Sequence, residues 1–157
     1  MIDLEPRPIV MIVEARFYKN IADEMMAGAI AVLEKMDVEF ERFAVPGAFE
    51  IPAAIKFALH AAEVTSGNKT FDGYIALGCV IRGETSHYDY VCGESARGLM
   101  DLINKYSLAV GYGILTCDNR EQAWERASRN KGDKGAAAAK ACLDMILIKN
   151  RLGKLQR

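Results

Sequence analysis

Apolar residues recur along the chain in two alternating patterns. Short runs rich in β-branched residues, such as Ile9 to Glu14, are typical of strands buried on both faces of a sheet. Between them lie longer stretches with apolar residues at helical spacing, such as Lys19 to Met36. These patterns predict strands at residues 9–14, 38–45, 74–81 and 108–115, and helices at residues 19–36, 48–64, 90–106, 120–128 and 136–152.

Strands that alternate with helices imply βαβ units, a parallel sheet and right-handed crossovers. We therefore expect an α/β fold: a three-layer α/β/α sandwich around a four-stranded parallel sheet of flavodoxin-like order 2-1-3-4. The chain has 157 residues and no low-complexity linker, so residues 1–157 should form a single domain. The residues before Ile9 offer an extra strand to the sheet edge of a neighbouring subunit.

Composition and charge argue against several classes of partner. The formal net charge of −1 provides no general basic field for nucleic acid. No apolar run reaches the roughly 18 residues that span a bilayer, and the first residues lack the layout of a signal peptide. We expect no nucleic acid and no membrane among the partners.

The cysteines favour a cytoplasmic protein with reduced thiols. Cys79, Cys92, Cys117 and Cys142 contain no C-x-x-C pair, and two histidines are too few to complete a zinc site. We expect these cysteines to be small buried residues.

A ligand site should lie where the strands end, because open parallel sheets bind ligands beyond the carboxyl ends of their strands. This rule singles out residues 15–18, 46–50, 82–87 and 116–119. In the third segment Gly83 allows close backbone approach, and the amides of Glu84 and Thr85 precede a helix, where anions bind. His87 can carry a proton near neutral pH. An ordinary helix cap by Thr85 or Ser86 is the alternative.

Aromatic and basic residues extend this candidate site. Phe17 and Phe49 follow the first two strands and favour a flat ligand slightly over plain packing, and Glu50 can accept hydrogen bonds from hydroxyl groups. A basic group follows the fourth strand, at Arg126, Arg129, Lys131 and Lys134. It can hold a phosphate, or it can be a solvated face.

Two further features have structural interpretations. His60 lies within a predicted helix with no polar constellation near it, which indicates a structural or surface role. Gly111-Tyr112-Gly113 lies within a strand pattern, so it indicates close packing and not a phosphate loop.

The chain resembles the lumazine synthase family over residues 9–152. The resemblance rests on A-R-F at residues 15–17, V-P-G-A-F-E-I-P at 45–52, L-G-C-V-I-R-G-E-T-S-H-Y-D-Y-V at 77–91, G-I-L-T at 113–116, E-R-A at 125–127 and G-D-K-G at 132–135. It implies that 5-amino-6-(D-ribitylamino)uracil condenses with 3,4-dihydroxy-2-butanone 4-phosphate, with no metal and no organic cofactor. It also implies a pentamer, or a multiple of it, with sites between adjacent subunits, and riboflavin synthase as a candidate partner.

The resemblance assigns a role to each candidate residue. Phe17 matches the aromatic that stacks on the pyrimidine ring. Ala48, Phe49 and Glu50 match the segment that binds the ribityl chain. The backbone of Cys79, Val80 and Ile81 matches the strand end that contacts the polar edge of the pyrimidine. Phosphate binding falls to Gly83, Glu84, Thr85, Arg126 and Lys134. His87 matches the proton-transfer residue, and Tyr112 the aromatic presented to the adjacent subunit.

Two positions depart from the family pattern. Tyr18 stands where many members have Asn, and Ala137 lies in a run of alanines where many members carry an acidic partner for the phosphate arginine. These departures leave room for a non-catalytic protein that binds riboflavin or a lumazine. A structural shell protein and an electron carrier of flavodoxin type are further alternatives. Intact His87 and Arg126 oppose the former, and the lack of an FMN phosphate loop opposes the latter.

Overall fold

The computed structural model of the chain describes residues 7–65 and 70–154. The strands are β1 (Ile9–Ala15), β2 (Glu39–Val45), β3 (Gly73–Ile81) and β4 (Val110–Cys117). The helices are α1 (Lys19–Lys35), α2 (Ile51–Val64), α3 (His87–Tyr106), α4 (Arg120–Ala127) and α5 (Lys134–Lys154), with a 3-10 turn η1 (Ala48–Glu50) ahead of α2. The segment expected to pair with a neighbouring subunit lies largely in residues 1–6, outside the described residues.

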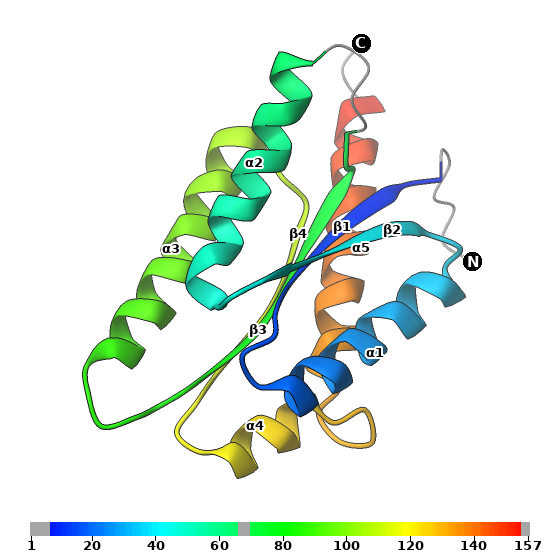
Figure 1. Ribbon diagram of the computed structural model, residues 1–157. Coiled ribbons are helices and arrows are strands. Elements are labelled where there is room, and N and C mark those ends of the chain that lie inside the picture. The colour runs from blue at the N-terminus through cyan, green and yellow to red at the C-terminus, as the bar shows by residue number, and fades with distance from the viewer. Residues whose placement is uncertain (1–6, 66–69, 155–157) are drawn as a thin grey trace.

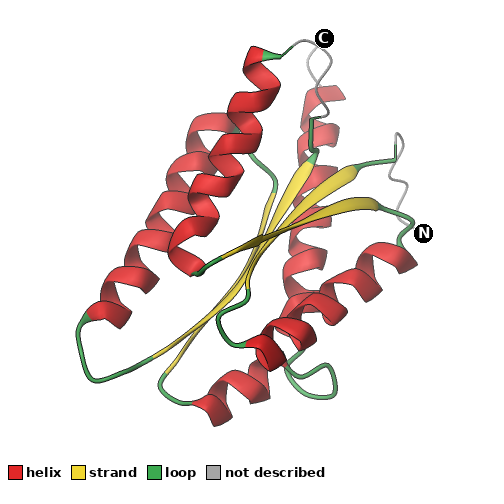
Figure 2. Cartoon of the chain, viewed as in Figure 1, coloured by secondary structure: helices red, strands yellow, loops and turns green. Residues whose placement is uncertain are grey.

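All four strands are parallel and lie in the order β2-β1-β3-β4, which confirms the predicted topology. Helices α1, α4 and α5 cover one face of the sheet, and α2 and α3 cover the other (Figures 1 and 2). Alternation along β1 explains the two cores. Val10 and Ile12 belong to the core under α1 and α5, whereas Met11 and Val13 belong to the core under α2 and α3.

Close contact on the α1 and α5 face requires glycine. A Cβ at Gly135 would collide with the carbonyl oxygen of Met25 in α1, and one at Gly111 would collide with that of Ala138 in α5. Gly111 therefore packs closely against a helix, as its place in a strand pattern predicted. These contacts bring α5 down onto both α1 and β4.

Boundaries differ from the prediction where local backbone chemistry overrides the apolar pattern. α3 begins at His87 and not at Tyr90, since the chain already has helical backbone angles at Ser86. β4 begins two residues late because Ser107 takes a left-handed conformation, and the amide of Leu108 bonds back to Ile103. α5 begins two residues early because the Asp133 carboxylate accepts a hydrogen bond from the amide of Ala136, at 3.3 Å.

Candidate active site

The carboxyl ends of β1, β2 and β3 surround a hollow of about 500 Å³, which we call the main groove. Most residues expected at the site line it: Phe17, Ala48, Phe49, Glu50, Cys79, Val80, Ile81, Gly83, Thr85 and His87. Glu84 is exposed and does not line the groove. Three segments that are far apart in the sequence therefore meet, as the strand-end rule predicts.

The main groove also contains residues to which the sequence analysis gave no individual role, although Tyr18, Pro46 and Gly47 fall in the strand-end segments that it singled out. Pro46 and Gly47 lie at the end of β2, Tyr18 follows Phe17, and Tyr88 and Val91 come from the first turns of α3. Tyr88 and Val91 are three residues apart and share a face of α3, as helical spacing would have shown had the helix been predicted to begin at residue 87. Tyr18 departs from the family pattern, so only its place in the strand-end segment 15–18 indicated that it lies at the site.

Two aromatic rings stand open at the mouth of the main groove. The Phe17 side chain is 73% exposed and that of Phe49 is 55% exposed. The Phe17 ring meets Tyr18 edge to face, with centroids 5.0 Å apart and planes at 72°. One face of each exposed ring is therefore not used in packing, and a flat ligand can stack there.

The turn between β3 and α3 contains hydrogen-bond donors that the described residues leave unused. Ser86 makes no capping hydrogen bond with its side chain, and the Thr85 hydroxyl accepts only a long one, at 3.4 Å, from the amide of His87. A Cβ at Gly83 would meet nothing within 4 Å, so the space beside the turn is open. The amides of His87 and Asp89 are thus taken up by the Thr85 hydroxyl and the Ser86 carbonyl, whereas those of residues 83–86 have no partner among the described residues and can bind an anion.

Arg82 ties this turn to its surroundings. Its guanidinium lies 4.1 Å from the centre of the Tyr88 ring and forms ion pairs with Asp118 at 3.2 Å and Asp89 at 3.5 Å. Its backbone amide bonds to the carbonyl of Cys117 at the end of β4. The start of α3 and the end of β4 are held together through this one side chain.

Cys79 lies at the base of the main groove as a neutral thiol. Burial, and to a smaller extent the neighbouring Cys117, raises the pKa of this thiol to about 12. A neutral thiol is a poor nucleophile, so Cys79 contributes backbone and volume to the groove. All four cysteines are free; Cys79, Cys117 and Cys142 are buried and Cys92 is half-buried.

The remaining predicted residues lie in a second hollow of about 340 Å³, between β4 and α5, which we call the edge groove. Tyr112, Arg126 and Lys134 line it together with Thr116 and Ala137. The two grooves share no lining residue. Arg82 therefore links the end of β4 to the start of α3. The side chains of β4, however, contribute to the edge groove and not to the main groove.

Arg126 is lightly held in the edge groove. Its guanidinium donates to the backbone carbonyl of Gln122 at 3.2 Å, and no carboxylate pairs with it among residues 7–65 and 70–154. Ala137, the second departure from the family pattern, lines the same groove. The Arg126 side chain is left available for an anionic ligand.

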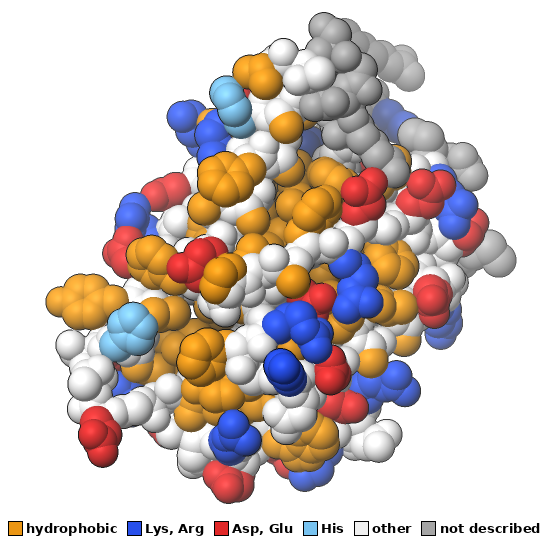
Figure 3. Space-filling view, viewed as in Figure 1, with side chains coloured by type: hydrophobic (Ala, Val, Ile, Leu, Met, Phe, Trp, Pro, Cys, Tyr) orange, Lys and Arg blue, Asp and Glu red, His pale blue; other side chains and the backbone are white. Residues whose placement is uncertain are grey.

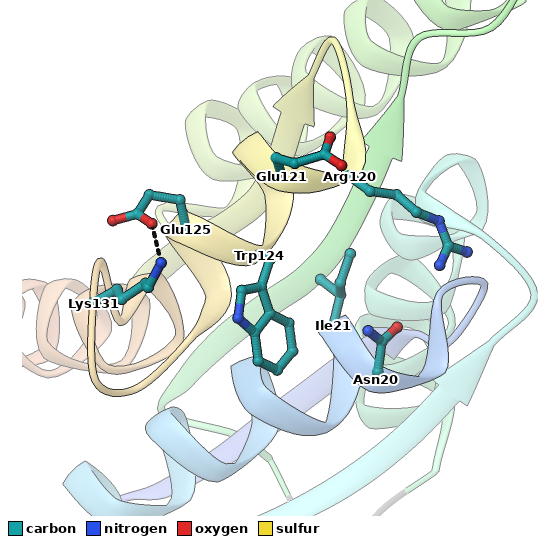
Figure 4. A pocket seen from close by; sticks show the side chains of 7 residues that line it. All are labelled: Asn20, Ile21, Arg120, Glu121, Trp124, Glu125 and Lys131. Carbon is teal, nitrogen blue, oxygen red and sulfur yellow. Dashed lines mark hydrogen bonds and ion pairs between the residues drawn. The ribbon is translucent and has the colours of Figure 1, made fainter.

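Other candidates from the sequence have structural roles. Lys131 pairs with Glu125 at 2.5 Å beside a third hollow between α1 and α4, where the Trp124 ring points toward Ile21 and Asn20 (Figure 4). His60 is exposed on α2, with Nδ1 3.9 Å from Glu63, which confirms the surface interpretation. Within the described ranges, no cluster of three or more His, Cys, Asp or Glu side chains could hold a metal ion. No helix there is both long and apolar enough to cross a membrane.

Comparison with known proteins identifies close relatives over nearly the whole chain. A model of the 6,7-dimethyl-8-ribityllumazine synthase family matches residues 8–150. The 6,7-dimethyl-8-ribityllumazine synthase of Bartonella tribocorum is 50% identical over 98% of this chain and 97% of that protein. 6,7-Dimethyl-8-ribityllumazine synthase 1 of Rhizobium meliloti is 55% identical over 92% of this chain and 93% of its own. The synthase of Agrobacterium fabrum is 50% identical over 94% of this chain and 98% of its own.

Proposed function

The chain belongs to the 6,7-dimethyl-8-ribityllumazine synthase family, and from that premise we propose how its residues divide the work of the reaction. It is a transferase of riboflavin biosynthesis. It condenses 5-amino-6-(D-ribitylamino)uracil with 3,4-dihydroxy-2-butanone 4-phosphate to the lumazine, with release of phosphate and water. No finding favours the non-catalytic alternative.

The separation of the two grooves is the observation that carries our assignment. The residues matched to the uracil and to proton transfer line the main groove, whereas Tyr112, Arg126 and Lys134 line the edge groove. We assign a complete site to the main groove of one subunit and the edge groove of the next. On this assignment Arg126 and Lys134 reach the substrates together with Tyr112, from the neighbouring subunit.

The uracil occupies the main groove. Its ring stacks on the open face of Phe17, and its polar edge meets the backbone of residues 79–81 at the end of β3. The ribityl hydroxyls lie along Ala48 and Phe49, where the Glu50 carboxylate accepts hydrogen bonds from them. Glu50 lies at the start of α2, so its position is fixed by a helix end.

The butanone phosphate binds at the turn between β3 and α3. Free amides beside Gly83 and Thr85 hold the phosphate, the exposed Glu84 contributes only its amide, and the neighbouring Arg126 and Lys134 add positive charge. His87, at the first residue of α3, moves protons as the amine adds to the ketone, water leaves and phosphate departs. Both substrates are reactive, so holding them together can supply much of the rate.

The family assembles as homo-oligomers, and we propose a cyclic pentamer or a multiple of it. A hollow of about 690 Å³ with an apolar lining that includes Phe43, Phe57 and Phe71 lies along β2 and α2, and hydrophobic side chains gather there (Figure 3). The opposite edge, β4, carries the edge groove beside exposed Met145 and Ile148 of α5. Two different apolar surfaces at opposite edges of one sheet suit head-to-tail contact in a closed ring.

Three further assignments complete the proposal. Residues 1–157 act as one domain, because two cores share the single sheet. Free buried cysteines suit the reducing cytoplasm. Riboflavin synthase, which the resemblance names as a partner, would receive the product.

A direct assay tests the proposed site. The purified protein should convert the two substrates to the lumazine with one phosphate released per product, followed by lumazine absorbance and by phosphate detection. Phe17→Ala should raise the KM of the ribitylaminouracil about tenfold, because stacking on an aromatic side chain contributes on the order of 1 kcal/mol. Binding of the uracil without turnover would instead support the non-catalytic alternative, and an unchanged KM would contradict the role of Phe17.

A further inference from the structure

A buried carboxylate interrupts the apolar pattern of β1 beside the main groove. Glu14 is 3% exposed and follows Val10 and Ile12 on the face of the strand that packs under α1. The alternation of β1 places an apolar residue at this position. Burying a charge costs several kcal/mol of desolvation free energy, which good pairing only offsets. A carboxylate at this position therefore calls for a structural or functional explanation.

Glu14 is the centre of an ionic network of four side chains. Its two oxygens accept hydrogen bonds from Arg16 at 2.9 Å and from Arg42 of β2 at 3.0 Å. Arg16 also bonds to Asp23 of α1, at 2.5 Å. Two carboxylates and two guanidinium groups balance, and the network joins the end of β1 to β2 and to α1.

The turn held by this network carries Phe17. The Phe17 ring is 73% exposed, so packing of its own does little to fix it. Its position depends on the backbone of residues 16–18 and on the edge-to-face contact with Tyr18. The Tyr18 ring in turn lies 5.5 Å from the guanidinium of Arg120. The ion pairs of Arg16 therefore fix the turn on the β1 side of Phe17, and the ring contact with Tyr18 restrains the Phe17 ring on the α1 side.

We propose that Glu14 is a positioning residue for the uracil substrate. By fixing Arg16 between β1 and α1, the buried carboxylate holds the turn in the geometry that presents the Phe17 ring to the main groove. This inference rests on the proposed stacking role of Phe17. Glu14 itself touches no substrate and acts only through the turn.

Glu14→Gln is a mild way to break the network. It removes the buried charge and does not leave an opposite charge buried and unpaired: Arg16 keeps Asp23, and the Arg42 side chain is 46% exposed. The large cost of breaking a buried ion pair comes from the charge that is left buried, and neither guanidinium is deeply buried here, with 32% exposure for the Arg16 side chain and 46% for that of Arg42. The fold should therefore survive while the turn gains freedom.

Steady-state kinetics with both substrates test the proposal. Glu14→Gln should raise the KM of the ribitylaminouracil about tenfold, because a small misplacement of a positioning group has effects of this size. The KM of the butanone phosphate and the thermal midpoint should change little. Asp37→Asn is the matched control: it breaks the 2.6 Å ion pair with Arg7 at the far end of β1, and Asn tolerates the left-handed backbone of that residue. This control should leave both KM values unchanged.

A double-mutant cycle separates this proposal from the role of Phe17. If Glu14 acts through Phe17, then Glu14→Gln should add nothing to the KM of a Phe17→Ala enzyme. A full additional tenfold loss in that background, or equal losses for both substrates with a falling thermal midpoint, would overturn the positioning role. An effect of Glu14→Gln with none from Phe17→Ala would overturn the stacking role instead. Should Glu14→Gln fail to fold, Asp23→Asn releases the other end of Arg16 from an exposed carboxylate and must shift the same KM if the proposal is right.

Discussion

The chemical role that we assign to each residue of this site depends on its position relative to the carboxyl ends of the strands. His87 is the first residue of α3, beside first-turn amides that lack side-chain caps. Arg126 lies in a different groove and keeps its guanidinium free of carboxylates throughout the described ranges. His87 and Arg126 thus lie in separate grooves of one chain, and on the proposed assignment they act together where two copies meet.

His87→Ala should lower turnover by about ten- to a hundredfold, at the low end of what one general acid or base contributes. Activity should persist, because orientation of two reactive substrates supplies much of the rate. The measurement is kcat at saturating concentrations of both substrates. His60→Ala, at an exposed position on α2, is the control and should leave kcat unchanged. Full turnover by the His87 variant would remove this residue from the mechanism.

Arg126→Ala should cost more than His87→Ala, because the guanidinium both binds the phosphate and stabilises it as it leaves. We expect a higher KM for the butanone phosphate together with a lower kcat, by a total of about 100- to 1000-fold in kcat/KM. Arg129→Ala provides the matched control, since Arg129 lies outside both grooves. If both kinetic constants for the butanone phosphate are unaltered in the Arg126 variant, another cation holds the phosphate.

At the scale of elements, the apolar pattern predicted the order of strands and helices, and therefore the sheet topology and the main groove. Strands such as β1 and β3 are nearly uniform in burial, so their patterns are hard to mistake. Boundaries were less predictable because they depend on single backbone conformations, such as that of Ser107, and on caps such as Asp133.

Apolar periodicity also failed to predict several features of the candidate site. Tyr88 was missed because the predicted helix began three residues later than α3 does. The pairing of Glu14 with Arg42 depends on the register of β1 and β2, which apolar periodicity does not specify at the level of single side chains. Separation of the main and edge grooves could not be predicted either, because it depends on how α4 and α5 pack along β4, which lines the edge groove alone.

The contact between α1 and α5 gives a prediction at this scale. Gly135→Ala places a methyl group against the backbone of Met25, which cannot yield without moving α1, so the protein should lose about 1 to 3 kcal/mol of stability. Gly153→Ala in the same helix has no atom within 4 Å and should be neutral or slightly stabilising. Thermal midpoints of the two variants give the comparison. An equal effect of both substitutions would mean that the helices have room to separate.

For the whole molecule, the proposed head-to-tail ring pairs two different edges of the sheet. The main groove opens where β1, β2 and β3 end, while the edge groove follows β4. On the proposed assignment, each chain supplies part of one site and part of another. A head-to-tail ring completes every site, whereas an isolated chain completes none.

Mixed assemblies offer a decisive test of shared sites. His87→Ala removes a group from the main groove, and Arg126→Ala removes one from the edge groove, so each variant alone carries a defect in every site. If the two impaired proteins are unfolded together and reassembled, on the order of a quarter of the contacts should join an intact main groove to an intact edge groove. Activity should recover to about that fraction of the wild-type value, measured as lumazine formed per subunit. Each variant reassembled alone is the control. If both groups came from the same chain, no mixture could restore a complete site, and the reassembled protein would stay as inactive as its components.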